Sequence, residues 1–73
     1  MFKSISALKN ALKQIKNISD DDIQQTVLSE TNHITELMFV NKNNQEVLGY
    51  ATITYQGIRP GYGKVFDTTA RFA

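Results

Sequence analysis

The sequence predicts the α+β class, with an N-terminal amphipathic helix packed on one face of a three- or four-stranded antiparallel meander sheet. Apolar residues repeat with the period of a helix near the start of the chain and alternate with the period of a strand near its end. Short connections between the expected strands make neighbours in sequence neighbours in space, which gives the meander order. The 73 residues allow a single domain, residues 1–73, whose small core makes oligomerisation an expected source of stability.

A helix is expected over about residues 3–16. Its apolar residues fall three or four positions apart and form one stripe; they are Ile5, Leu8, Leu12 and Ile15. Ser4 stands where an N-cap would accept a backbone hydrogen bond, and Lys13 and Lys16 complement the helix dipole at the other end. The basic face that we expect to point to water consists of Lys9, Lys13 and Lys16.

Residues 20–30 allow two interpretations, and both remain open from the sequence. Ser19 and the aspartates after it can cap a second helix, with Ile23 and Val27 one turn apart. Alternatively, the aspartates form a turn into a strand over residues 24–30, where β-branched side chains favour the pleated form. The strand is the interpretation that we favour.

The next strand is expected from His33 to Val40. Its apolar run from Leu37 to Val40 is continuous, whereas a strand with one face in water alternates between apolar and polar residues. The run therefore indicates that both faces of this strand are covered. The asparagine-rich residues 41–45 are expected to form the turn into the last hairpin.

The last hairpin is expected to have strands over about residues 47–55 and 65–72, where side chains alternate with the period of a strand. Residues 56–63 between them are rich in glycine and contain the only proline, so we expect a long loop there. The sheet residues predicted to pack under the helix are Leu37, Phe39, Val47, Ala51, Ile53, Phe66, Ala70 and Phe72. The apolar residues left on the opposite face are Met38, Val40, Leu48 and Tyr50, and an exposed patch of this kind indicates a partner surface.

Few residues suit catalysis or metal binding. The chain has no cysteine, and its only histidine, His33, is three positions from Glu36, which places the two side chains on opposite faces of a strand. One histidine without cysteine cannot supply a typical zinc site, and consecutive aspartates lack the alternate spacing of a calcium loop. We therefore expect no enzyme activity, no metal and no cofactor.

The predicted loop over residues 57–64 is the strongest candidate contact segment. Arg59, Tyr62 and Lys64 lie close together in it, and two cations with an aromatic ring suit either a protein hot spot or a nucleic acid. The loop does not match a nucleotide-binding P-loop, because five residues rather than four separate its outer glycines and no serine or threonine follows its lysine.

Charge is distributed unevenly along the chain. The formal net charge is +1, but residues 1–17 carry +4, residues 18–46 carry −5 and residues 47–73 carry +2. The basic ends are compatible with nucleic acid, whereas the acidic middle and the small net charge favour a protein partner.

Together these observations predict a small non-catalytic interaction protein, adaptor or inhibitor-like and homodimeric, that contacts a protein target through an exposed sheet face and the 57–64 loop. The predicted binding residues are Met38, Leu48, Tyr50, Arg59, Tyr62 and Lys64. The alternative is a small nucleic-acid- or nucleotide-binding protein that uses the basic helix face and the same loop. The start of the chain lacks a signal-peptide pattern and no run approaches the roughly 20 apolar residues of a membrane span, so we expect a cytoplasmic protein without a membrane partner.

Overall fold

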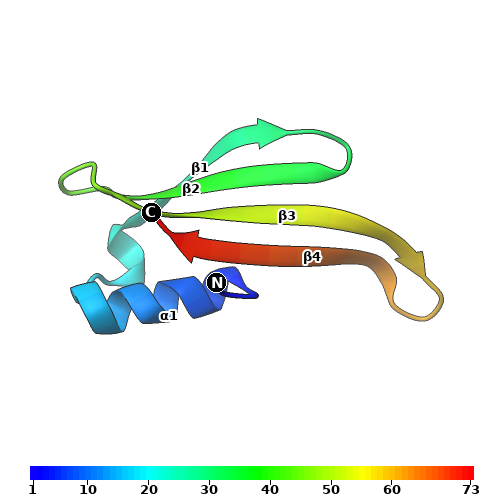
Figure 1. Ribbon diagram of the computed structural model, residues 1–73, viewed down its shortest axis with the longest axis horizontal. Helices are drawn as coiled ribbons and strands as arrows, with labels where there is room; N and C mark the ends of the chain where they lie inside the picture. Colours follow the sequence, from blue (N-terminus) through cyan, green and yellow to red (C-terminus); the bar gives the residue numbers. More distant parts are fainter.

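The computed structural model describes residues 1–73 and contains one α-helix, one short 3₁₀ helix and four strands in a single antiparallel sheet. In chain order the elements are α1 (Ile5–Lys16), η1 (Asp20–Asp22), β1 (Ile23–Glu30), β2 (Ile34–Asn41), β3 (Val47–Arg59) and β4 (Gly63–Phe72). The strand order β1-β2-β3-β4 follows the chain, and α1 contacts β3 and β4 (Figure 1). The predicted α+β class, with a helix on a meander sheet, is confirmed, and the sheet has four strands rather than three.

α1 begins and ends where the sequence indicates. Ser4 has an extended backbone, and its Oγ accepts a hydrogen bond from the Ala7 N–H at 3.0 Å. Asn17 ends the helix in the left-handed conformation, at φ 55°, which asparagine tolerates better than most residues. Lys13 and Lys16 lie in the last turn, where their charge complements the negative end of the helix dipole.

The segment after α1 forms a strand rather than a second helix, which confirms the favoured interpretation. The aspartates make a single 3₁₀ turn, in which the Asp22 N–H donates to the Ser19 carbonyl at 3.0 Å. The Asp22 carbonyl accepts from the Lys42 N–H at 2.9 Å, and this bond holds the start of β1 beside the end of β2. From Ile23 to Glu30 every residue but one has a cross-strand partner on β2. This pairing stabilises the strand more than the weak helical pattern would stabilise a helix.

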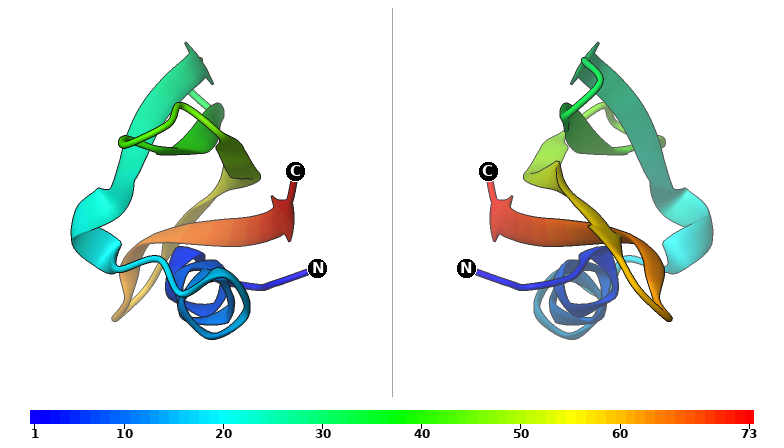
Figure 2. Two further views of the ribbon diagram at one scale, coloured as in Figure 1. Left: turned by 90° about the vertical axis from the view of Figure 1, so that its left-hand side faces the viewer. Right: turned by 90° about the vertical axis from the view of Figure 1, so that its right-hand side faces the viewer.

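The core forms where α1 packs against β3 and β4, at one end of the sheet. End-on views show a strongly twisted sheet with α1 beneath its β3–β4 side (Figure 2). The buried members of the core are Leu8, Leu12, Ile18, Leu37, Phe39, Leu48, Ala51 and Ala70. Ile5 and Ile53 pack against them and are partly buried. Full burial of a leucine or phenylalanine side chain contributes about 1.5–3 kcal/mol, so this small cluster carries much of the stability.

The close approach of α1 to β3 depends on Gly49. A Cβ atom at this position would lie 2.5 Å from the Arg71 carbonyl oxygen and 3.1 Å from Leu8 Cδ2. Leu8 has no exposed surface, so its side chain cannot give way without opening the core. A larger residue at position 49 would therefore displace the β4 backbone at Arg71 and crowd Leu8 of α1.

Leu48 lies in the core, and the prediction that it faces away from the helix is wrong. A β-bulge leaves Leu48 without a cross-strand partner, because Phe39 pairs with Gly49 whereas Val40 pairs with Val47. The extra residue shifts the alternation of side chains along β3. Leu48 consequently joins the core cluster and is only 2% exposed.

Three other residues predicted in the core are largely exposed. Ile15, Phe66 and Phe72 are 69%, 56% and 42% exposed, and Val47 is half-buried. α1 is about 18 Å long, whereas the molecule is 42 Å long, so α1 does not reach Phe66. Phe72 packs edge-on against Phe2 instead of entering the core, with ring centroids 5.2 Å apart.

The connection between β3 and β4 is much shorter than the expected loop. β3 continues to Arg59 and β4 begins at Gly63, and the Tyr62 N–H donates to the Arg59 carbonyl at 3.1 Å within the turn. Gly61 and Gly63 have φ values of 83° and 75°, which let the chain reverse over these few residues. A second bulge, at Gln56, allows pairing to continue past the point where the alternating pattern breaks.

The molecule is elongated for its length. Its extents are 42 × 23 × 20 Å, and its radius of gyration is 13.4 Å against about 11 Å for a compact domain of this size. Its accessible surface is 5160 Å², whereas a compact monomer of this mass exposes about 4,500 Å². The β3–β4 hairpin, which projects beyond the β1–β2 turn in Figure 1, accounts for this shape.

Truncation of two residues on α1 tests which of them belongs to the core. Leu12→Ala is expected to lower the free energy of unfolding by about 2–5 kcal/mol, because its side chain is fully buried. Ile15→Ala is expected to change it by no more than about 0.5 kcal/mol, because most of its side chain is already in water. Chemical denaturation measures both values, and equal losses would contradict the placement of Ile15 outside the core.

Gly49→Ala tests the contact between α1 and β3. We expect the free energy of unfolding to fall by about 1–3 kcal/mol, because the new methyl group meets the Arg71 backbone and the fully buried Leu8. Thermal and chemical unfolding both measure this loss. A variant as stable as the parent protein would show that α1 does not need this close approach.

Candidate functional site

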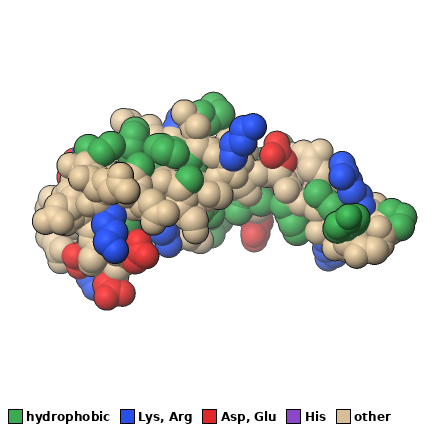
Figure 3. Space-filling model, turned by 90° about the horizontal axis from the view of Figure 1, so that it is seen from below, with side chains coloured by type: hydrophobic (Ala, Val, Ile, Leu, Met, Phe, Trp, Pro, Cys, Tyr) green, Lys and Arg blue, Asp and Glu red, His purple; other side chains and the backbone are tan.

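The end of the β3–β4 hairpin is a part of the sheet that α1 leaves uncovered. Toward the turn of this hairpin, the last backbone hydrogen bond that joins it to the rest of the sheet is the one from the Tyr55 N–H to the His33 carbonyl, at 2.7 Å. Beyond this bond the two strands pair only with each other, and we call this section, residues 55–66, the arm (Figure 1). Figure 3 shows apolar and basic side chains gathered at the narrow right-hand end, which is the tip of the arm.

Three aromatic rings form a row at the base of the arm. Tyr55 and Phe66 are cross-strand partners with ring centroids 5.5 Å apart. His33 stacks on Tyr55 at a centroid distance of 6.3 Å, with 25° between the ring planes. The row is on the same side of the sheet as α1, because Phe66 is an even number of residues from the buried Ala70 on β4.

Two further apolar residues are exposed on the same side of the sheet. Val27 is on this side because it pairs with the buried Leu37. Ile58 is on this side too, because it pairs with Lys64, and Lys64 is two residues from Phe66 along β4. Val27 and Ile58 are 55% and 71% exposed. We call the surface formed on the arm by Tyr55, Ile58 and Phe66 the arm face.

The three residues predicted as a contact loop lie at the tip of the arm but do not converge. Tyr62 is in the turn and is 82% exposed. Arg59 pairs with Gly63, whereas Lys64 pairs with Ile58, so the two cations are on opposite sides of the ribbon. Figure 3 shows basic side chains on both sides of the tip. A flat partner surface at the tip can therefore contact Tyr62 together with Arg59 or together with Lys64, but not with both cations at once.

The opposite face of the sheet is less exposed than the sequence indicated. Met38 and Tyr50 are cross-strand partners and are half-buried, Val40 is buried, and Leu48 belongs to the core. The Arg71 guanidinium lies 4.9 Å from the centroid of the Tyr50 ring, in a cation–π arrangement that shields the ring from water. None of these four residues is therefore as exposed as Ile58 or Phe66.

A pocket of about 160 Å³ lies at the other end of the molecule. Its lining residues are Ile15, Lys16, Val47, Leu48, Phe72 and Ala73. Sites for small molecules or cofactors usually enclose about 300–1,000 Å³, so this pocket is large enough for a single side chain only.

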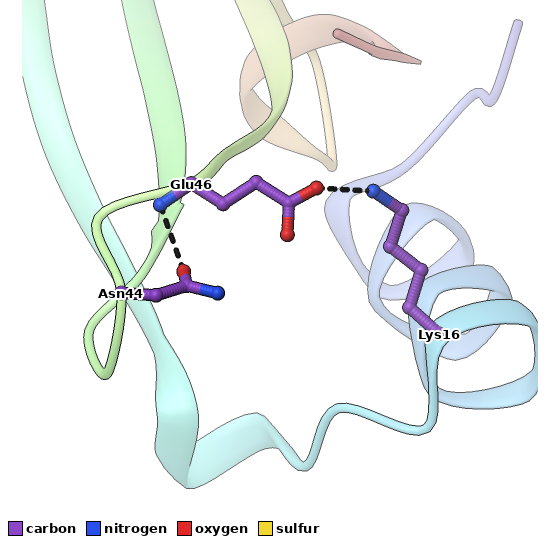
Figure 4. A network of polar contacts seen from close by, with 3 residues as sticks. All are labelled: Lys16, Asn44 and Glu46. Atoms are coloured by element: carbon purple, nitrogen blue, oxygen red, sulfur yellow. Dashed lines mark hydrogen bonds and ion pairs between the residues drawn. The ribbon is translucent and has the colours of Figure 1, made fainter.

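The lysines of α1 and the cations of the arm do not form one basic surface, because α1 and the tip lie at opposite ends of the molecule (Figure 1). Lys16 Nζ pairs with Glu46 Oε1 at 2.7 Å, and the Glu46 N–H donates to Asn44 Oδ1 at 2.9 Å (Figure 4). Both charged side chains of this pair are nearly half exposed, so water weakens the attraction and the pair adds at most about 1 kcal/mol.

The structure also shows how the histidine and the acidic side chains are placed. His33, the single histidine, is exposed and stacks on Tyr55 instead of pairing with a carboxylate. No group of three or more His, Cys, Asp or Glu side chains is placed to hold a metal ion. Among the helices, none has the length and apolarity needed to cross a membrane.

Sequence reasoning does not identify Val27, Ile58 and Phe66 as surface residues. Val27 lies in a segment that patterns alone leave undecided, and Ile58 falls in the expected loop. Phe66 has the spacing of a core residue, and alternation does not reveal how far the helix reaches. One signal in the sequence indicated an exposed apolar surface: apolar residues continue at the spacing of a strand toward the turn of the last hairpin.

In the comparison with known proteins, no family model, curated protein or solved structure matches the chain.

Proposed function

We propose that the protein is a small non-catalytic interaction protein that binds other protein chains through its arm. The observation that supports this most strongly is the arm face, on which Ile58 and Phe66 are each more than half exposed. Side chains of this size are usually covered, and a contiguous group of them on a small protein marks a contact surface. An adaptor or inhibitor-like role in the cytoplasm agrees with a sequence that contains no cysteine.

A second copy of the chain is the partner that we propose for the arm face. The accessible surface of 5160 Å² exceeds that of a compact monomer by about 600 Å². This excess approaches the roughly 800 Å² that each partner buries in an interface of standard size. A two-fold pairing would place Phe66 and Ile58 of each copy against the arm face of the other, since a symmetric interface uses the same surface twice.

The tip of the arm is the surface that we propose for a target protein. Tyr62 is almost free of contacts with the rest of the molecule, and Arg59 lies directly before the turn. Tyrosine and arginine are the residue types most enriched at the energetic centres of protein interfaces. Because Tyr62 is in the turn, beyond the last residue of the arm face, a dimer through the arm face would leave the Tyr62 side chain accessible.

Phe66→Lys tests the arm face. The parent protein is expected to sediment as a dimer at tens of micromolar, and Phe66→Lys is expected to sediment as a monomer because it buries a charge in the apolar contact. The matched control is Ile15→Lys, which replaces an equally exposed apolar residue at the other end of the molecule and should leave the dimer intact. A parent protein that is monomeric at this concentration, or a dimer that Ile15→Lys dissociates and Phe66→Lys does not, would contradict the proposal.

Binding of single-stranded nucleic acid is the second candidate function. The row of His33, Tyr55 and Phe66 across neighbouring strands favours it, because bases stack on exposed aromatic rings of a sheet. Charge argues against it, since Lys64 is the single cation on this side of the arm, and affinity for nucleic acid comes mainly from contacts with phosphates. The lysines of α1 cannot assist, because they lie at the far end of the molecule (Figure 1).

A salt titration distinguishes the two candidate functions. If the arm binds protein, a fluorescent single-stranded oligonucleotide should show no change in anisotropy at low ionic strength and micromolar protein. If the arm binds nucleic acid, the anisotropy of the oligonucleotide should rise at low salt and fall again as salt increases. Phe66→Ala should abolish this rise. Met38→Ala, on the opposite face, is the control for the second outcome.

A further inference from the structure

The outer edge of β1 is a second site of interest, separate from the arm. β1 and β4 are the two edge strands of the sheet. The edge of β4 is partly closed, because Phe2 and Ala70 exchange two backbone hydrogen bonds of 2.7 and 2.8 Å. No segment lies beside β1 in this way, and Figure 1 shows β1 at the margin of the sheet.

The hydrogen-bond pattern identifies which backbone groups of β1 face outward. The bond from the Lys42 N–H to the Asp22 carbonyl makes these two residues a hydrogen-bonded pair. Backbone groups in an antiparallel ladder alternate, so Gln25 and Val27 direct both N–H and C=O away from β2. Ile23 does the same, but its N–H is already bonded to the Asp20 carbonyl in η1.

This edge has little of the protection that natural edge strands usually carry. Residues 23–29 include no charged residue, no proline and no glycine. The single protective feature is the bulge at Leu28, which interrupts the register between Val27 and Ser29. A free edge therefore extends over residues 23–27, which is long enough to pair with a short extended segment.

Charge around the edge determines what kind of segment fits. Asp20, Asp21 and Asp22 stand at one end of the free edge, and Glu30 stands at the other. No lysine or arginine occurs from residue 17 to residue 41. A second copy paired antiparallel about Gln25 would bring Glu30 of each copy close to the aspartate turn of the other, and facing like charges disfavour such pairing.

We propose that the edge of β1 binds an extended segment of a partner protein that carries lysine or arginine at both ends, by addition of a fifth strand to the sheet. Backbone bonds to Gln25 and Val27 would supply the affinity, as in other cases of strand addition. The partner's alternate side chains would lie beside Ile23 and Val27, so apolar or β-branched residues suit those positions. The flanking carboxylates would select for basic ends.

Peptide binding tests this site. The probe is a fluorescent, end-capped peptide of alternating valine and threonine with two lysines at each end; its partner probe has glutamates in place of the lysines. We expect the lysine peptide to bind and to slow hydrogen exchange of the Gln25 and Val27 amides, with no such effect from the glutamate peptide. Exchange that is equally fast with and without the lysine peptide would overturn the proposal, as would equal binding of both peptides.

Two variants at one position assign the binding to the backbone. Gln25→Pro removes the outward N–H but no bond to β2, and proline is tolerated at such edge positions. Gln25→Ala keeps the N–H and changes only the side chain. We expect about a tenfold loss of affinity for Gln25→Pro, comparable to one hydrogen bond, and less than about a twofold change for Gln25→Ala. Equal affinity of the two variants would contradict the backbone contact, and if Gln25→Pro fails to fold, the exchange measurement on the parent protein decides.

The result is independent of the arm. Phe66→Lys should leave peptide affinity unchanged, because Phe66 is on β4 and the peptide pairs with β1 at the other edge. Failure of the peptide to bind would therefore leave the proposed role of the arm face untouched, and a monomeric parent protein would leave the β1 site untouched.

Discussion

The contact between Leu8 and Gly49 determines where α1 can lie, and the position of α1 determines what the rest of the sheet exposes. Gly49 places no side chain between Leu8 and the backbone of β3, so α1 packs closely against β3 and β4 at one end of the sheet. From there its length of about 18 Å cannot extend to the other end of a molecule 42 Å long. The exposed arm face is therefore a consequence of core packing at the opposite end.

The sequence predicts the elements well because their signals are local. The cap at Ser4, the apolar stripe and the alternating strands each depend on residues within one turn or one strand, and all reappear in the structure. Two of the errors, the side on which Leu48 lies and the length of the last loop, arise where one residue changes the phase of a pattern. Bulges at Leu48 and Gln56 add a residue to β3, and periodicity alone cannot show that Leu48 turns inward or that pairing continues beyond Gln56.

The site depends on information that no short pattern contains. His33, Tyr55 and Phe66 come from three separate segments, and only the register of β2, β3 and β4 aligns their rings. Phe66 has the alternation of a core residue, and its exposure follows from the length of a helix some fifty residues earlier in the chain. Tyr62 could be recognised from the sequence as exposed because its neighbours are glycines, which bury nothing around it.

The two proposed surfaces use different physical forces, and this allows one small sheet to hold both. The arm face would bind a partner through burial of apolar area, which is non-directional and does not require a particular backbone conformation in the partner. The edge of β1 attracts through aligned N–H and C=O groups, which demand an extended partner in one register. The charges reinforce the separation, since the acids gather around β1 while Arg59 and Lys64 lie at the tip of the arm. A partner segment with basic ends would be drawn to β1 and repelled from the tip, so occupancy of one surface need not compete with occupancy of the other.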